Sequence, residues 1–168
     1  MALSPDLTHF LASVHPYDSL ADSVLRSLSE TCETKEFLAG EPIYSVGDTV
    51  EGLYVIAEGE VEVTDEADAQ ISILGPRNSF GERALLKGDR SSRTARATQA
   101  SRAILLPSDT FHALIDEHAT VRRFFDRGRS QRSETSRFET LSVEQLMTSD
   151  PVACAPGDKI RKAAALMA

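Results

Sequence analysis

The fold is decided by the stretch from Gly40 to Val63, which reads GEPIYSVGDTVEGLYVIAEGEVEV. Runs of aliphatic, aromatic and β-branched residues alternate in it with turn residues such as Gly47-Asp48 and Glu58-Gly59. This spacing is typical of short strands joined by tight turns. The part from Leu53 to Val63 predicts a hairpin with its bend at Glu58-Gly59.

The same pattern extends on both sides of this stretch, from residue 34 to residue 107. The β-prone runs lie at residues 36–38, 43–44, 53–57, 61–64, 71–74, 94–97 and 103–106. Many short strands with regular turns favour a structure that closes on itself and so protects its own edges. We therefore expect an α+β, mainly β fold: an eight-stranded β-roll (jelly-roll) over residues 34–107, flanked by N-terminal and C-terminal helices.

Helical patterns occupy the flanks, residues 1–33 and 108–140. Ser4-Pro5 begins the first of them, because serine is a good cap and proline suits the first helical position. Ser108-Asp109 predicts a cap after the roll. The last helix carries an apolar stripe formed by Val121, Phe124 and Phe125. This stripe predicts either packing onto the roll or the seam of a homodimer.

The β region is interrupted by GERALLK, residues 81–87, whose composition predicts a turn or two of helix. The interruption lies in a basic segment of a chain whose net charge is −8. Residues 77–102 hold seven Lys and Arg against two acidic residues. Such a segment either pairs with acidic surface of its own protein or faces an anionic ligand, and charge alone does not distinguish the two.

At this point the order of elements and two motifs resemble the cyclic-nucleotide-binding domain family. GEPIYSVGDTVEGLYVIAEGEVEV resembles the first half of that domain, and FGERALLKGDRSSRTARA, residues 80–97, resembles its phosphate-binding cassette. The resemblance covers roughly residues 10–140 and implies cAMP or cGMP as the ligand, with no cofactor required. The implied site comprises Phe80, Gly81, Glu82, Arg90, Ser91, Ser92, Arg93 and Thr94.

The cassette departs from the family pattern at the residue that binds phosphate. Ser91 stands where the family has its phosphate arginine, with Arg90 beside it and Arg93 two residues beyond. By the resemblance, Glu82 would hold the ribose and Arg90 or Arg93 the phosphate, while Gly81 and Ser92 would supply backbone donors. The alternative is a degenerate cassette that binds no cyclic nucleotide and serves in interaction or dimerisation.

Residues 141–168 carry a second resemblance. SVEQLMTSDPVACAPGDKIRKAAALM is similar to the opening of a CBS (cystathionine-β-synthase) domain. We expect residues 141–168 to be the truncated start of such a domain. This order resembles bacterial signal-transduction proteins in which a putative nucleotidyltransferase domain follows, so the implied partners are the chain's own downstream CBS and nucleotidyltransferase domains.

Other function classes find no support in the residues. The four histidines and two cysteines show no metal-ligand spacing, and no G-x-S-x-G nucleophile motif occurs. No apolar run approaches the roughly 20 residues of a membrane helix. We expect a cytoplasmic, non-catalytic regulatory module that forms a homodimer and binds neither membrane nor nucleic acid. A catabolite-activator-like DNA-binding regulator is the second alternative, but it needs a winged-helix segment where the CBS-like residues stand.

Overall fold

The structure, a computed structural model, describes residues 5–127. These residues belong to one compact unit that ends at Arg127. The predictions for Ser4, for the end of the last helix and for the CBS-like segment lie outside the described residues, and the domain boundaries at residues 140 and 141 stay predictions.

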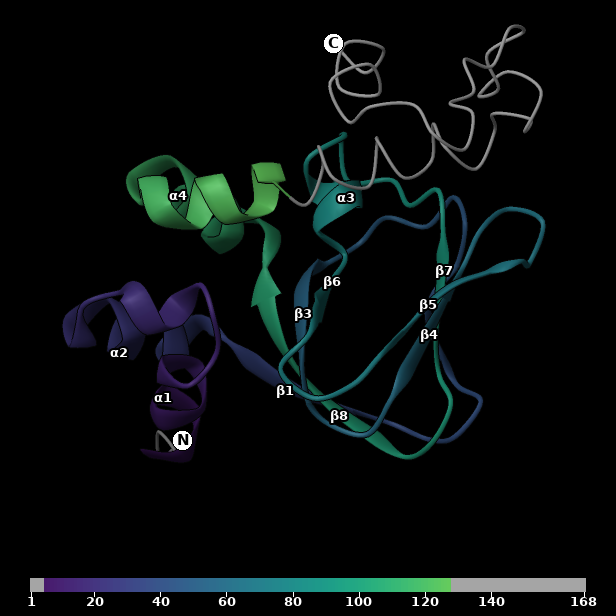
Figure 1. Ribbon diagram of the computed structural model, residues 1–168, viewed down its shortest axis with the longest axis horizontal. Coiled ribbons are helices and arrows are strands. Elements are labelled where there is room, and N and C mark those ends of the chain that lie inside the picture. The colour runs from purple at the N-terminus through teal and green to yellow at the C-terminus, as the bar shows by residue number, and fades with distance from the viewer. Residues whose placement is uncertain (1–4, 128–168) are drawn as a thin grey trace, which may run out of the picture. The chain divides into compact units, whose positions relative to one another are not determined.

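The described chain begins and ends with helices and has eight strands between them (Figure 1). The helices are α1 (Pro5–Ala12), the 3-10 helix η1 (Tyr17–Ser19), α2 (Asp22–Thr31), α3 (Glu82–Leu85) and α4 (Ser108–Glu117). Residues 119–127 are also helical. The strands are β1 (Glu33–Phe37), β2 (Pro42–Tyr44), β3 (Gly52–Glu58), β4 (Val61–Thr64), β5 (Gln70–Leu74), β6 (Ser79–Phe80), β7 (Thr94–Ala97) and β8 (Ser101–Pro107).

The strands form two antiparallel four-stranded sheets, in the orders β1-β8-β3-β6 and β2-β7-β4-β5. The expected mainly β roll with flanking helices is therefore confirmed. Strands predicted at residues 61–64 and 94–97 have those bounds in the structure. The other strands begin one to three residues before the predicted runs and end within one residue of them. The two-residue strand β6 is too short to produce a periodic signal, and the sequence does not predict it.

The hairpin predicted at Glu58-Gly59 is wrong. Strand β3 pairs with β8 and β6, whereas β4 pairs with β5 and β7 in the other sheet. Five successive residues of β3, from Gly52 to Ile56, are buried, as expected for a strand in the interior of a sheet. The turn therefore carries the chain from one sheet to the other instead of folding it back on itself.

The helices gather on one side of the roll, with α3 at the end of β6 (Figure 1). They complete a single core, because Leu25, Phe111 and Val121 are buried in the same cluster as the inner residues of β3 and β8. Val121 and Phe125 are 0% and 4% exposed and Phe124 packs against the cluster, so packing within the chain accounts for the stripe they form. The predicted cap Ser108 is instead the first residue of α4, and Pro107 precedes the helix.

Candidate functional site

The cassette rests on three aromatic rings that pack together, two of them stacked. Phe80, the last residue of β6, stacks on Tyr54 of β3 with ring centroids 5.1 Å apart and an interplanar angle of 10°. Tyr44 of β2 lies 6.1 Å from Phe80 and 6.2 Å from Tyr54. All three side chains are buried. These rings join both sheets and give the cassette a rigid floor.

Gly81 lets the chain turn from this floor into α3. Its φ is +98°, a left-handed conformation that residues with a Cβ rarely adopt. A Cβ at this position would lie 3.0 Å from the carbonyl oxygen of Gly52 and 3.4 Å from Val50. The cassette therefore approaches the start of β3 more closely than a larger residue permits, and Glu82 is held, half-buried, as the first residue of α3.

The loop after α3 is hydrogen-bonded along its length to the segment before β3. The backbone N–H of Val50 donates to the Asp89 carbonyl at 2.8 Å, and Thr49 forms an isolated bridge with Arg90. The Ser91 N–H donates to the Asp48 carbonyl at 2.9 Å. These bonds determine where each candidate phosphate ligand points.

The side chains of two of those candidates bond to the backbone of the protein itself. The guanidinium of Arg90 is exposed and donates to the Gly47 carbonyl at 3.1 Å. Ser91 is 7% exposed, and its hydroxyl donates to the Arg93 carbonyl at 2.7 Å while accepting the Arg93 N–H at 3.1 Å. Ser92 is exposed, and the Thr94 hydroxyl accepts the Val46 N–H at 3.3 Å.

Glu82 and Arg93 act on the same buried group, the hydroxyl of Tyr44. Burial raises the pKa of the Tyr44 phenol above its ordinary value, the negative charge of Glu82 raises it further, and the positive charge of Arg93 opposes the rise. The two charged residues, 11 positions apart in the chain, thus both lie near enough to Tyr44 for their charges to act on its phenol. The structure brings Phe80, Gly81, Glu82 and Arg93 together there.

Sequence reasoning treats Tyr44 only as part of a β-prone run and misses its place in the site. The hydroxyl of a buried tyrosine needs a hydrogen-bond partner. A tyrosine within a β-prone run is therefore the only sequence signal for a polar group at this place. Asp89 is also missed. Its carboxylate accepts from the Ser108 hydroxyl at 3.4 Å and lies 4.0 Å from Nε2 of His112, so it connects the cassette to α4.

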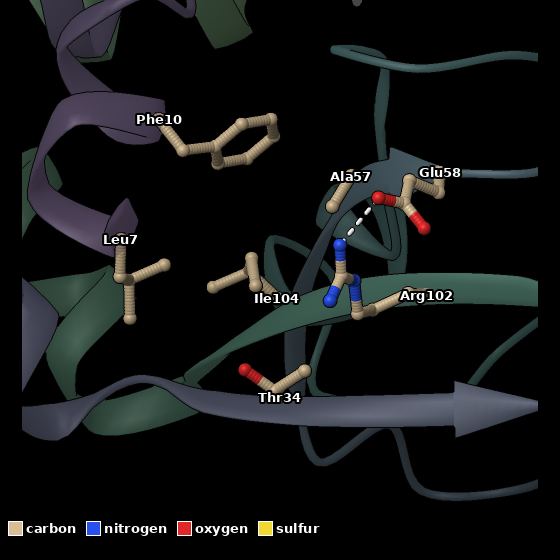
Figure 2. Close-up of a pocket in the computed structure, with 7 residues that line it drawn as sticks. All are labelled: Leu7, Phe10, Thr34, Ala57, Glu58, Arg102 and Ile104. Atoms are coloured by element: carbon tan, nitrogen blue, oxygen red, sulfur yellow. Dashed lines mark hydrogen bonds and ion pairs between the residues drawn. The ribbon is translucent and has the colours of Figure 1, made fainter. Parts of the chain in front are cut away.

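A separate hollow lies between α1 and the β1-β8-β3 sheet (Figure 2). It encloses about 430 Å³ and is lined by Leu7, Phe10, Thr34, Ala57, Glu58, Arg102 and Ile104. Figure 2 shows Arg102 paired with Glu58 at one end and the side chains of Leu7 and Phe10 at the other. Both charged side chains are largely exposed, and none of the predicted site residues lines this hollow.

Metal sites and membrane-spanning helices are both absent from residues 5–127. Within that range no cluster of three or more His, Cys, Asp or Glu side chains is arranged to hold a metal ion. No helix in the described part of the chain combines the length and the apolar character needed to cross a membrane.

Comparisons with known proteins agree with this architecture. A model of the cyclic nucleotide-binding domain matches residues 34–118. The cAMP-dependent protein kinase regulatory subunit of Eremothecium gossypii is 29% identical over 123 residues, which are 73% of this chain and 27% of that protein. The chain spans less than a third of the length of the curated relatives it first matches.

Solved structures show the same fold. The catabolite activator protein of Thermus thermophilus has a TM-score of 0.63 at 25% identity, covering 77% of this chain and 61% of that one. The regulatory subunit of a cAMP-independent protein kinase A from Trypanosoma cruzi, bound to guanosine, has a TM-score of 0.64 at 25% identity, covering 73% of this chain and 44% of that one. Because the family model matches half of its length, this chain belongs to the cyclic nucleotide-binding domain family.

Proposed function

We propose that this domain is a non-catalytic sensor that binds a cyclic purine nucleotide, cAMP or cGMP, in the cassette of residues 80–97. Binding is relayed through the helices after Pro107 to downstream CBS and nucleotidyltransferase domains. The carboxylate of Glu82 accepts hydrogen bonds from the ribose hydroxyl. Gly81 permits the close backbone approach that this contact needs.

One observation carries the proposal: the opposite charges of Glu82 and Arg93 both act on the buried phenol of Tyr44, which belongs to the aromatic floor. A carboxylate acceptor and a guanidinium near one phenol match the polarity of a ribose phosphate, which offers hydroxyl donors at one end and anionic oxygens at the other. The family membership of residues 34–118 supports the same choice of ligand.

Isothermal titration calorimetry of the 168-residue chain with cAMP and cGMP tests the proposal. Glu82→Gln removes the charge and keeps the shape, so it should weaken nucleotide binding about tenfold or more. The matched control is Glu66→Gln, an exposed carboxylate in the turn between β4 and β5, which should bind as the wild type does. Absence of heat with either nucleotide at millimolar concentration would refute the sensor.

A second candidate function is a ligand-free interaction module, and Ser91 favours it. The side chain at the phosphate position is neutral, buried and already hydrogen-bonded to its own loop. The similar Trypanosoma cruzi protein is the regulatory subunit of a cAMP-independent protein kinase A, and its solved structure holds guanosine, an uncharged nucleoside. Titration with guanosine and adenosine therefore belongs in the same experiment: binding of neither nucleotides nor nucleosides identifies the interaction module.

The assembly of the protein stays a prediction. Light scattering on the 168-residue chain tests the proposed homodimer, whose seam cannot use the buried side chains of Val121 and Phe125 without unpacking them. The alternative of a catabolite-activator-like DNA-binding regulator predicts nucleotide-dependent binding to duplex DNA. The sensor proposed here predicts no such binding, and a gel-shift assay with and without cAMP distinguishes them.

A further inference from the structure

We infer that the anionic group of the ligand is bound by Arg93, which immediately precedes β7, together with the hydroxyl of Tyr44 in β2, and not by the side chains of residues 90 and 91. This inference rests on the proposed function, because it concerns the same cassette. It names the residues that select a nucleotide over the corresponding nucleoside.

The first step excludes the loop candidates. Reaching into the site would cost Arg90 its bond to the Gly47 carbonyl and would disturb its bridge to Thr49, which helps to hold the loop. The hydroxyl of Ser91 has one donor and two acceptor positions, and its donor is already engaged by the Arg93 carbonyl. Neither side chain therefore meets a phosphate without first breaking contacts of the folded loop.

The second step shows how the same serine directs Arg93. Ser91 bonds both the N–H and the carbonyl of Arg93, so the backbone of this residue is held just before β7 begins. Ala95 is 0% exposed and Arg96 is exposed, which sets the inner and outer faces of the strand. Arg93 has the same parity as Ala95 and is half-buried, as expected for a side chain that follows the inner face.

The third step brings Tyr44 to the same place. Tyr44 lies directly opposite Ala95 in the β2–β7 register, so Arg93 is its diagonal neighbour, a separation that long side chains bridge. Burial is the largest effect on the Tyr44 phenol and raises its pKa, while the positive charge of Arg93 lowers that pKa by a smaller amount. The phenol therefore stays protonated and remains a hydrogen-bond donor.

The chemistry of the pair suits a singly charged phosphodiester. The guanidinium offers a planar fork of N–H donors and the phenol adds an O–H donor, while the aromatic floor lowers the local polarity and strengthens these bonds. The negative charge of Glu82 also acts on the Tyr44 phenol. Because a carboxylate repels an anion and a guanidinium attracts it, the phosphate of the ligand faces Arg93 and its ribose faces Glu82.

The test compares cAMP with adenosine, and cGMP with guanosine, by calorimetry on the 168-residue chain. Arg93→Gln should weaken cyclic nucleotide binding about ten- to hundredfold and leave nucleoside binding unchanged. Tyr44→Phe should act in the same direction by about three- to tenfold. Arg93→Lys should recover part of the loss, since it restores the charge without the fork.

Two arginines of the same segment provide matched controls. Arg90→Gln removes the loop guanidinium, and Arg96→Gln removes an exposed guanidinium on the outer face of β7. Both should change cyclic nucleotide affinity less than twofold. Circular dichroism and thermal melts confirm that each variant is folded before it is titrated.

The outcomes separate this inference from the function on which it rests. A nucleotide preference that Arg93→Gln abolishes supports the inference. Loss of that preference in Arg90→Gln, or wild-type binding of nucleotide and nucleoside with equal affinity, overturns the inference and leaves a ligand-binding cassette in place. Failure of the wild type to bind any of the four compounds overturns the inference and the proposed function together.

Discussion

Gly81 and Gly88 bound the short helix of the cassette, and both have a φ of +98°. They differ in their surroundings: a Cβ at Gly81 would press on the Gly52 carbonyl, whereas nothing lies within 4 Å of a Cβ at Gly88. Comparing substitutions at these two residues therefore separates two contributions to the free energy of unfolding: the cost of a left-handed backbone and the cost of a close contact. Of these two glycines, only Gly81 is required by tertiary packing.

Gly81→Ala should therefore destabilise the domain more than Gly88→Ala does. Each substitution costs about 1–2 kcal/mol for an L-residue in the left-handed region. Gly81→Ala adds the strain of a 3.0 Å contact with backbone that cannot easily move. Urea unfolding of the two variants measures the difference, and equal losses would show that the approach of the cassette to β3 is loose.

The side chain of Tyr17 places a polar hydroxyl group in the hydrophobic core. Its side chain is 1% exposed, and among the buried side-chain N and O atoms of residues 5–127 the Tyr17 hydroxyl lacks a hydrogen-bond partner. Tyr17→Phe should leave the free energy of unfolding unchanged or raise it by about 1 kcal/mol, because an unsatisfied buried hydroxyl is removed.

Ser91→Ala is the matched comparison for Tyr17→Phe. Its hydroxyl has a donor and an acceptor partner in Arg93, so its loss should lower the free energy of unfolding by about 1 kcal/mol. Chemical denaturation of both variants under the same conditions checks the opposite signs. A stability loss in Tyr17→Phe would mean that its hydroxyl is satisfied.

At the scale of elements, the loop after α3 contacts two other parts of the fold, the segment before β3 and helix α4. Backbone hydrogen bonds join it to residues 47–50, and Asp89 joins it to α4 through Ser108 and His112. The first attachment sets the geometry of the cassette. The second is the direct polar link, within the described chain, between the cassette and the helix that follows the roll.

A double-mutant cycle with Asp89→Asn and His112→Gln measures the strength of this link. Asparagine tolerates the left-handed backbone of residue 89, whose φ is +66°, so the change removes charge without added strain. Asp89 Oδ1 and His112 Nε2 lie 4.0 Å apart, so the cycle should give a favourable coupling. It should stay below about 1 kcal/mol, since both side chains are over 40% exposed. A coupling of zero would contradict a direct interaction between the two side chains.

At the scale of the whole molecule, one core contains several acids whose neutral form is favoured by burial. Burial raises the pKa of Tyr54 from 10.0 to about 12 and that of the Cys32 thiol from 9.0 to about 12, and it also raises the pKa of Tyr17 and Tyr44. The folded state therefore holds more protons than the unfolded state above about pH 9. Stability is full below that pH and is lost as the pH rises through the folded pKa values.

The free energy of unfolding should accordingly fall between pH 9 and pH 11. For Tyr54 alone, a folded pKa of about 12 predicts a loss on the order of 1 kcal/mol at pH 11. Urea titrations at both pH values measure the slope, and Tyr54→Phe should reduce the loss by about that amount. The same loss in wild type and variant would show that Tyr54 titrates at its ordinary pKa when folded.

The sequence by itself determined seven of the eight strands and most of the helices. These depend on local signals: alternating apolar residues between Gly and Pro turns for the runs at 61–64 and 94–97, and a proline at the start of α1. The sequence also predicted the short helix that begins at Glu82, because the motif that contains it is contiguous. The stripe of Val121, Phe124 and Phe125 marked an apolar face without showing what covers it.

Only the tertiary structure decided which strands pair and which side chains meet. β3 pairs with β8, about 50 residues further along the chain, so the bend at Glu58-Gly59 is a crossing between sheets and not a hairpin. Tyr44 lies opposite Ala95 in the β2–β7 register, and the Ser91 hydroxyl bonds the backbone of Arg93. Local patterns specify the period of a strand but not its partner, because register results from packing between residues far apart in sequence.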